Sequence, residues 1–104
     1  MNRKYILQYI KKSVTKVSPG AKIILYGSEA RGDSKPESDI DILILADAEE
    51  LSYKERTAIT NSLYDIELET GVLISPLVYT QKQWYNRPFN TPFYINILNQ
   101  GKRI

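Results

Sequence analysis

The sequence predicts an α/β fold, organised as an α+β sandwich in which a small mixed β-sheet is flanked by helices. Three observations lead to this prediction: short apolar segments typical of strands, longer segments with one apolar face typical of helices, and the alternation of the two along the chain. The chain has 104 residues, of which 42% are hydrophobic and 25% charged, and this suits one globular core. We therefore expect residues 1–104 to form a single domain.

The first part of the chain is predicted to contain one helix and one strand. Residues 3–17 place apolar side chains at helical spacing with lysines elsewhere, and the Ser-Pro-Gly sequence at 18–20 ends that helix. Residues 22–26 (KIILY) form a short apolar run that predicts a buried strand. The apolar face of the helix consists of Ile6, Ile10, Val14 and Val17.

The middle of the chain is predicted to form a turn, a loop and the most clearly marked strand. Residues 27–28 form a sharp turn, residues 29–31 form one helical turn before Gly32, and residues 33–38 form a polar loop. Residues 39–46 (DIDILILA) predict a strand whose alternate side chains face opposite sides. One face carries Ile40, Ile42 and Ile44, and the other carries Asp39, Asp41, Leu43 and Leu45.

A second long helix is predicted over residues 51–69, and Gly71 ends it. Residues 72–79 (VLISPLVY) predict a third strand, in which Pro76 indicates an edge position or a bulge. The apolar stripe of the helix consists of Leu51, Ala58, Ile59, Leu63 and Ile66.

The C-terminal part is predicted to contain a turn-rich connection and a final short helix. The connection runs from Pro88 to Pro92 around Phe89, and the helix over residues 93–100 stops at Gly101.

The composition limits the chemistry that the chain can perform. It has no cysteine, which excludes disulfides and thiolate chemistry, and no histidine, which removes the usual general base near neutral pH. No apolar run approaches the roughly 20 residues of a membrane-spanning helix. We expect a cytoplasmic protein without a membrane partner, whose chemistry depends on carboxylates, hydroxyls, backbone amides and basic side chains.

Three features converge within residues 27–41. A Gly-Ser turn follows a buried strand, and glycine lets a ligand approach the backbone closely while N–H groups at a helix start attract phosphate. Asp39 and Asp41 project from one strand face, where two like charges need a compensating cation such as Mg²⁺. Arg31 lies in the turn that follows Ser28, where it could reach phosphate oxygens.

The combination is more specific than its parts. Gly27-Ser28, ten intervening residues and then Asp39-Ile40-Asp41, within the string GSEARG…SDIDILIL, resembles the signature of the DNA polymerase β-like nucleotidyltransferase superfamily and its minimal nucleotidyltransferase (MNT) branch. The resemblance implies the polymerase β-like fold, with Gly27 and Ser28 binding the nucleotide triphosphate and Asp39 and Asp41 as catalytic Mg²⁺ ligands; Arg31, from its place in the turn, is expected to add a nucleotide-binding phosphate contact. It implies transfer of a nucleoside monophosphate from an NTP, with ATP the expected donor, to a hydroxyl.

One departure from that family concerns its third carboxylate, which lies on a neighbouring strand. In this sequence Ser75 takes the equivalent position, and the strand over residues 72–79 contains no acid. Glu67 and Glu69 precede the strand, but the predicted helix and turn place them away from the strand face, as solvated charges. The expected function is therefore an active enzyme with a depleted metal site, or alternatively a catalytically weakened module that binds nucleotide or protein.

The family also suggests a partner. MNT proteins pair with small helical HEPN-domain proteins in toxin–antitoxin systems, so the resemblance implies such a partner, whose tyrosine hydroxyl could be the acceptor. A third interpretation, a small interaction protein in which the two aspartates are incidental, requires the Gly-Ser spacing to be chance.

The distribution of charged residues and of aromatic residues allows more than one interpretation of their roles. All twelve acidic residues lie between Glu29 and Glu69, which suits a metal-bound polyanion or a partner of mixed charge, or arises by chance. The aromatic residues near the C-terminus are expected to supply core, with base stacking or partner binding as the alternative. Without a clear basic stripe, nucleic acid is not expected as the primary substrate. The aromatic cluster is Trp84, Tyr85, Phe89, Phe93 and Tyr94, and the basic residues expected on solvated surface are Lys22, Lys82, Arg87, Lys102 and Arg103.

Overall fold

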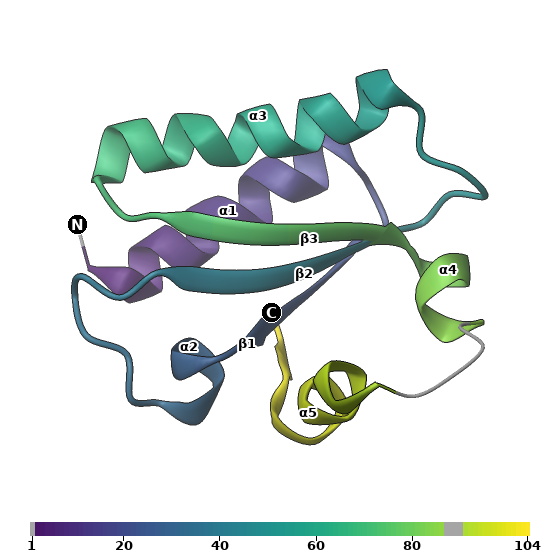
Figure 1. The fold of residues 1–104 in the computed structure, drawn as a ribbon. Coiled ribbons are helices and arrows are strands. Elements are labelled where there is room, and N and C mark those ends of the chain that lie inside the picture. The colour runs from purple at the N-terminus through teal and green to yellow at the C-terminus, as the bar shows by residue number, and fades with distance from the viewer. Residues whose placement is uncertain (1, 87–90) are drawn as a thin grey trace.

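The computed structural model describes residues 2–86 and 91–104 and confirms the sandwich of helices and sheet (Figure 1). Residues 88–90 of the predicted connection, with Phe89, and Arg87 lie outside the described residues, and Pro92 is the first residue of the last helix. The elements are α1 (Arg3–Val17), β1 (Lys22–Tyr26), α2 (Ser28–Arg31), β2 (Ile40–Ala46), α3 (Tyr53–Thr70), β3 (Ile74–Thr80), α4 (Gln81–Tyr85), α5 (Pro92–Gln100) and β4 (Lys102–Arg103).

The four described strands form one mixed sheet in the order β3-β2-β1-β4. β1 pairs antiparallel with β2 and with β4, while β2 pairs parallel with β3. The parallel pair requires a crossover, and α3 provides it. The sequence did not predict β4 or α4, because two residues are too few to show a period and five residues barely exceed one helical turn.

Alternation along β2 divides the apolar residues between two layers. Ile40, Ile42 and Ile44 pack against α1 and α3 in the larger core, and Leu43 and Leu45 pack on the other face with Trp84 and Ile97. Figure 1 shows α1 and α3 on one side of the sheet and α5 on the other. The predicted strand face assignment is therefore confirmed.

Most of the predicted helical stripes are buried. In α1, Ile6, Ile10 and Val14 are buried, and in α3 Ile59, Leu63 and Ile66 are buried. The predictions for Val17 and Ala58 were wrong, because both side chains are exposed; Val17 is the last residue of its helix, where the chain leaves the sheet. Gly71 ends α3 in the left-handed conformation, with φ of 74°.

The aromatic residues divide between core and surface. Trp84 is buried, with 2% of its surface exposed, and packs with Leu43 and Leu45. Tyr85 and Phe93 are exposed, so the prediction of core holds for Trp84 and fails for these two. Both belong to helices that lie over the open side of the sheet, where no further layer covers them.

Strand β3 lies at an edge of the sheet, as Pro76 predicted. Side chains from other elements form hydrogen bonds with backbone groups of β3. The Ile74 N–H donates to Glu67 Oε1 at 2.7 Å, and the Val78 carbonyl accepts from Arg56 Nη1 at 2.8 Å. Since Pro76 also lacks an N–H, this edge offers little to a further strand.

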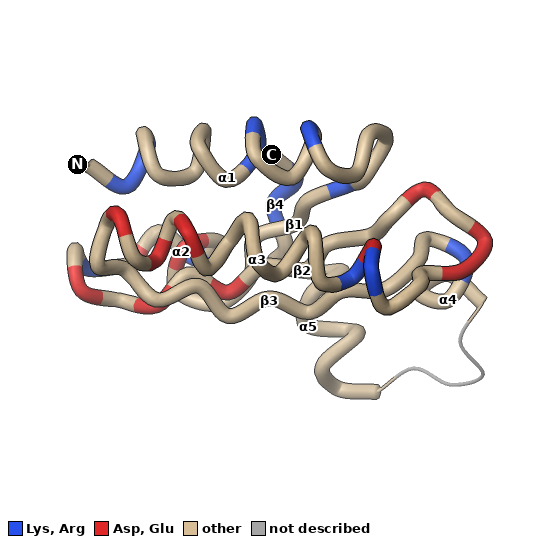
Figure 2. Tube along the Cα trace, turned by 90° about the horizontal axis from the view of Figure 1, so that it is seen from above, with Lys and Arg blue, Asp and Glu red and all other residues tan. Residues whose placement is uncertain are grey.

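Charges are segregated in space as they are in the sequence. Figure 2 shows lysines along α1 and basic residues at β4, while acidic residues gather on α2, α3 and the loop before α3. Among the described residues, no helix is long and apolar enough to cross a membrane.

Candidate functional site

One polar row crosses three strands at the end of the sheet where β2 and β3 begin. Tyr26 of β1 is the antiparallel partner of Asp41, and Asp41 is the parallel partner of Ser75 in β3. Residues paired in this way have their side chains on the same face of a sheet. The next row along the same face is apolar and consists of Ile24, Leu43 and Leu77.

Gly27 follows β1 directly and has a conformation that other residues rarely adopt, with φ of 69° and ψ of −145°. A Cβ atom at this position would lie 2.6 Å from Asp41 Oδ2. Glycine is therefore required here for two reasons: the backbone angle, and the close approach of the Asp41 carboxylate to the turn.

The electrostatics of Asp41 differ from those of an ordinary surface carboxylate. Burial raises its pKa, the neighbouring Asp39 raises it further, and Arg31 opposes them by a smaller amount. Asp39 immediately precedes β2 and is exposed. Burial, followed by the charge of Asp41 and by Tyr79, also raises the pKa of Tyr26. The site therefore carries more negative charge than its own side chains compensate.

The structure brings three of the five predicted residues into one cleft. Gly27, Arg31 and Asp41 line a cavity of about 250 Å³. Ser28 is the first residue of α2, next to Gly27, and Asp39 lies two residues before Asp41, outside the lining. Arg31 is exposed and its Nε donates to Asp33 Oδ2 at 3.3 Å, a weak surface pair that leaves the guanidinium accessible.

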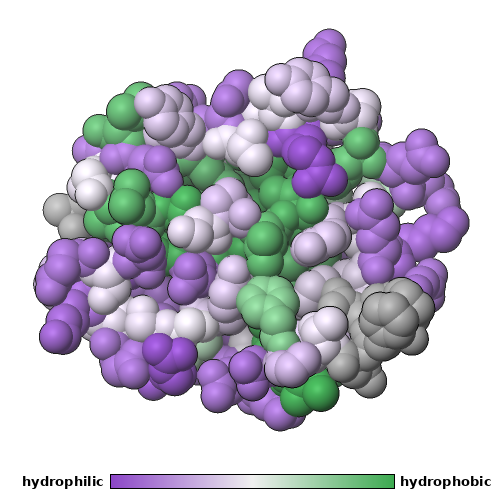
Figure 3. All heavy atoms as spheres, in the orientation of Figure 1, coloured by the Kyte–Doolittle hydropathy of each residue, from purple (hydrophilic) through white to green (hydrophobic). Residues whose placement is uncertain are grey.

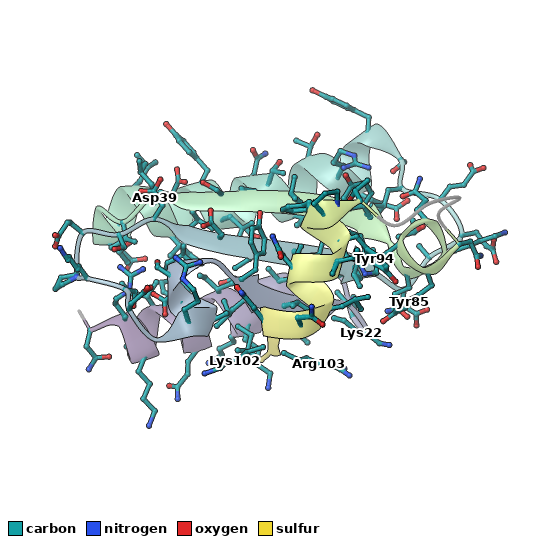
Figure 4. The ribbon with its side chains drawn as sticks, turned by 60° about the horizontal axis from the view of Figure 1, so that its bottom comes forward. Lys22, Asp39, Tyr85, Tyr94, Lys102 and Arg103 are labelled. Carbon is teal, nitrogen blue, oxygen red and sulfur yellow. The ribbon has the colours of Figure 1, made fainter. Side chains whose placement is uncertain are left out.

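The opposite wall of the cleft includes Phe93, from the aromatic cluster for which base stacking was the alternative, together with residues that sequence reasoning missed as site residues. It consists of Tyr26 and one side of α5, with Phe93, Asn96, Ile97 and Gln100. Figure 4 shows α5 lying across the sheet, with Asp39 toward one end of the sheet and Lys22 and Tyr85 toward the other. The available signal was the pair of amides four residues apart on the apolar side of the helix.

Ser75 takes the place expected for a third carboxylate, because it is the register partner of Asp41. Glu67 accepts from the Ile74 N–H, and Glu69 Oε2 accepts a hydrogen bond of 2.7 Å from the Tyr9 hydroxyl. Both glutamates therefore form hydrogen bonds with residues outside the cleft. Among residues 2–86 and 91–104, no group of three or more acidic side chains is placed to hold a metal ion.

A partly buried ion pair links α1 to the turn that carries Gly27 and Ser28. Arg3 of α1 pairs with Glu29 of α2, and their side chains are 16% and 8% exposed. Arg3 Nη1 also donates to the Pro36 carbonyl at 3.1 Å. Through Arg3, the first turn of α1 holds both α2 and the loop that leads into β2.

Larger cavities lie elsewhere but contain none of this chemistry. Two open grooves of about 440 and 460 Å³ follow the exposed side of α1 and are lined mainly by polar and lysine side chains. Neither contains a carboxylate or a glycine turn, so the smaller cleft at Asp41 is the better candidate site.

Comparison with known protein families identifies the chain at the level of family. The nucleotidyltransferase domain model matches residues 7–100. The chain belongs to this nucleotidyltransferase family. Two provisionally named protein adenylyltransferases of Methanocaldococcus jannaschii are similar to it. One is 38% identical over 81 residues, covering 78% of this chain and 74% of the relative, and the other is 32% identical over 101 residues, covering 95% of each.

Solved structures show the same fold. A toxin–antitoxin complex with AMP-PNP contains a chain with a TM-score of 0.59 and 22% identity, the match covering 99% of this nucleotidyltransferase and 72% of that chain. A structure of a tri-AMPylated Shewanella oneidensis HEPN toxin with its MNT antitoxin gives a TM-score of 0.61 and 20% identity, with 98% and 71% covered. The predicted nucleotidyltransferase family is confirmed by the family model, and the predicted fold by the solved structures.

Proposed function

We propose that this nucleotidyltransferase is a protein adenylyltransferase that transfers AMP from ATP to a hydroxyl of a partner protein. The observation that carries the proposal is the packing of Asp41 against Gly27, in a cleft that Arg31 also lines. This arrangement brings a carboxylate, a phosphate-accessible turn and a cation together in one small space. The relatives named protein adenylyltransferases support the choice of AMP and of a protein acceptor.

The residues present fit a divalent cation. Asp39 and Asp41 offer the hard oxygen ligands that Mg²⁺ prefers, and the pKa of Asp41 is raised first by burial and then by the neighbouring Asp39. We assign both aspartates as its ligands. When bound, Mg²⁺ supplies positive charge for the phosphate oxygens and the developing charge of the leaving group.

The chain's own residues then have defined tasks. The open backbone at Gly27, with the Ser28 hydroxyl and the Arg31 guanidinium, binds and orients the triphosphate. The acceptor oxygen forms a bond to the α-phosphorus, the bond from the α-phosphorus to the bridging oxygen breaks, and pyrophosphate leaves. The chain contains no histidine, so the proton of the acceptor passes to a carboxylate.

A small helical HEPN-type protein is the partner we propose. Structural neighbours are MNT antitoxins complexed with HEPN toxins, and this chain has exposed apolar side chains near the cleft. Figure 3 shows apolar residues gathered in the middle of the face that includes β3 and α5, with a polar rim. Exposed members on these two elements are Tyr79, Phe93, Ile95 and Leu98. We do not assign nucleic acid as the primary substrate.

A second candidate function is a nucleotide-binding, antitoxin-like module with weak or no transfer activity. The observation that favours it is Ser75 beside Asp41, where a third carboxylate would complete a second metal site. In this case the cleft binds ATP with Mg²⁺ while the partner contact provides the function.

A single experiment separates the two candidates. The protein is incubated with α-labelled ATP, Mg²⁺ and a HEPN-type partner, in parallel with Asp41→Asn and with Asp47→Asn as a matched control. Asp47 follows β2 at its other end and is exposed. Label on the partner that Asp41→Asn abolishes and Asp47→Asn retains supports the enzyme. Calorimetric ATP binding that needs Mg²⁺, without any label transfer, supports the second candidate, and absence of both contradicts the two together.

A further inference from the structure

Helix α5 presents amide side chains on the side that faces the sheet. Phe93, Asn96, Ile97 and Gln100 follow the spacing of one helical face, and all four line the cleft. Of these, Ile97 is buried in the core beneath the cleft. Asn96 and Gln100 are exposed, so their amide groups are accessible to a ligand in the cleft.

The opposite side of α5 reinforces this point. Ile95 and Leu98 are 44% and 59% exposed and lie outside the cleft lining. The amides of Asn96 and Gln100, by contrast, line the cleft. Among the described residues, neither the Asn96 nor the Gln100 side chain has a hydrogen-bond partner in the protein.

The remaining lining is aromatic. The rings of Tyr26 and Phe93 contact edge to face, with centroids 5.5 Å apart and an interplanar angle of 89°. Phe93 is 41% exposed, so part of its ring surface is available to a ligand. One wall of the cleft therefore combines aromatic surface with two side chains that each offer a hydrogen-bond donor and an acceptor.

We propose that this wall of α5 is the nucleobase subsite, in which Asn96 and Gln100 recognise the hydrogen-bonding edge of adenine beside Phe93. The inference rests on the proposed function, because it takes the phosphates to be bound at Gly27 and Arg31 in the same cleft. An amide pairs with adenine by accepting from its 6-amino group and donating to a ring nitrogen. α5 contains no charged residue, which suits a neutral base.

The test is calorimetric titration of three probes into the full chain with Mg²⁺: ATP, inosine triphosphate, which lacks the 6-amino group, and inorganic triphosphate, which lacks base and sugar. The variants are Asn96→Ala/Gln100→Ala and each single substitution. Asn99→Ala is the matched control, because Asn99 is an exposed amide of the same helix outside the cleft.

We expect the parent and Asn99→Ala to bind ATP about tenfold more tightly than inosine triphosphate, a factor typical of one good base contact. The double variant is expected to bind both nucleotides with the same affinity, while its affinity for inorganic triphosphate stays that of the parent. Because both amides are exposed, their truncation leaves the core intact, and the single variants decide the matter if the double variant unfolds.

Two outcomes overturn the inference and are distinguishable from each other. If ATP and inorganic triphosphate bind but the double variant keeps the parent's preference between the nucleotides, the base lies elsewhere and the proposed function stands. If neither ATP nor inorganic triphosphate binds to the parent, the proposed function fails and the inference fails with it.

Discussion

Replacing Ser75 by aspartate tests whether the row of Tyr26, Asp41 and Ser75 is a metal site that lacks one ligand. The new carboxylate would lie beside Asp41, because the two positions are paired in neighbouring strands. Adjacent strands are about 5 Å apart, and two unit charges at that distance repel by about 1–3 kcal/mol between an effective dielectric constant of 80 and one of 20. The repulsion adds to a pair in which Asp39 already raises the pKa of Asp41.

The assay is thermal unfolding of Ser75→Asp in chelator and in millimolar Mg²⁺, with Ser75→Asn as a neutral control of nearly the same shape. For a domain of this size a loss of 1 kcal/mol lowers Tm by about 4–8 °C. We therefore expect Ser75→Asp to have a Tm at least about 4 °C below that of Ser75→Asn in chelator. In Mg²⁺ the difference should close or reverse, since the third carboxylate then becomes a ligand.

The same variant should raise label transfer to the partner if the missing carboxylate limits the reaction. An equal Tm deficit in chelator and in Mg²⁺ would contradict the reasoning, because it would show that no cation binds between positions 41 and 75. If Ser75→Asn and Ser75→Asp both lowered Tm equally relative to the parent protein, the cause would be lost packing, and the electrostatic explanation would be removed.

Two further predictions follow from the same corner of the sheet. Gly27→Ala should destabilise the protein by about 1–3 kcal/mol and reduce nucleotide binding, because the new Cβ would displace the Asp41 carboxylate. Gly32→Ala is the control: Gly32 has φ of 79° in open space, so the change should cost about 1 kcal/mol without affecting nucleotide binding. Equal losses of nucleotide binding in the two variants would refute the explanation. Asp41→Asn should stabilise the metal-free protein at neutral pH: the folded-state pKa of Asp41 is raised above its ordinary value of 3.8, so the parent loses stability as pH rises through that interval. Denaturant unfolding across pH checks this, and a gain that persists unchanged below pH 3.8 would contradict it.

The sequence was sufficient for the fold because its strongest signals are local. The alternation in residues 39–46 set both faces of β2, and the proline at 76 set β3 at the edge. The family signature identified Gly27 and Asp41, and the position of Arg31 in the turn identified it as a phosphate contact; the structure places all three in one cleft. Their roles as ligands of nucleotide and metal remain proposals.

The wall of the cleft that α5 forms could not be predicted in the same way, because it depends on where this helix packs on the sheet. Asn96 and Gln100 are some 55 residues or more along the chain from Asp41, and ordinary polar residues on a short helix carry no signal until that helix is placed on the sheet. The pairing of Asp41 with Ser75 is also a matter of register, since a slip of one residue would have turned Ser75 to the other face.

The apolar strand with two aspartates at its start now has a physical explanation. Asp39 and Asp41 lie where β2 enters the sheet, on either side of the fully buried Ile40. Asp41 is held there by the glycine turn on one side, while Arg3 and Glu29 fix that turn from α1. The protein thus maintains an unfavourable carboxylate in a fixed place, with a raised pKa and a single weak opposing cation. Such an arrangement lowers stability unless a ligand compensates it, and we propose that a cation together with the phosphates it attracts supplies this compensation.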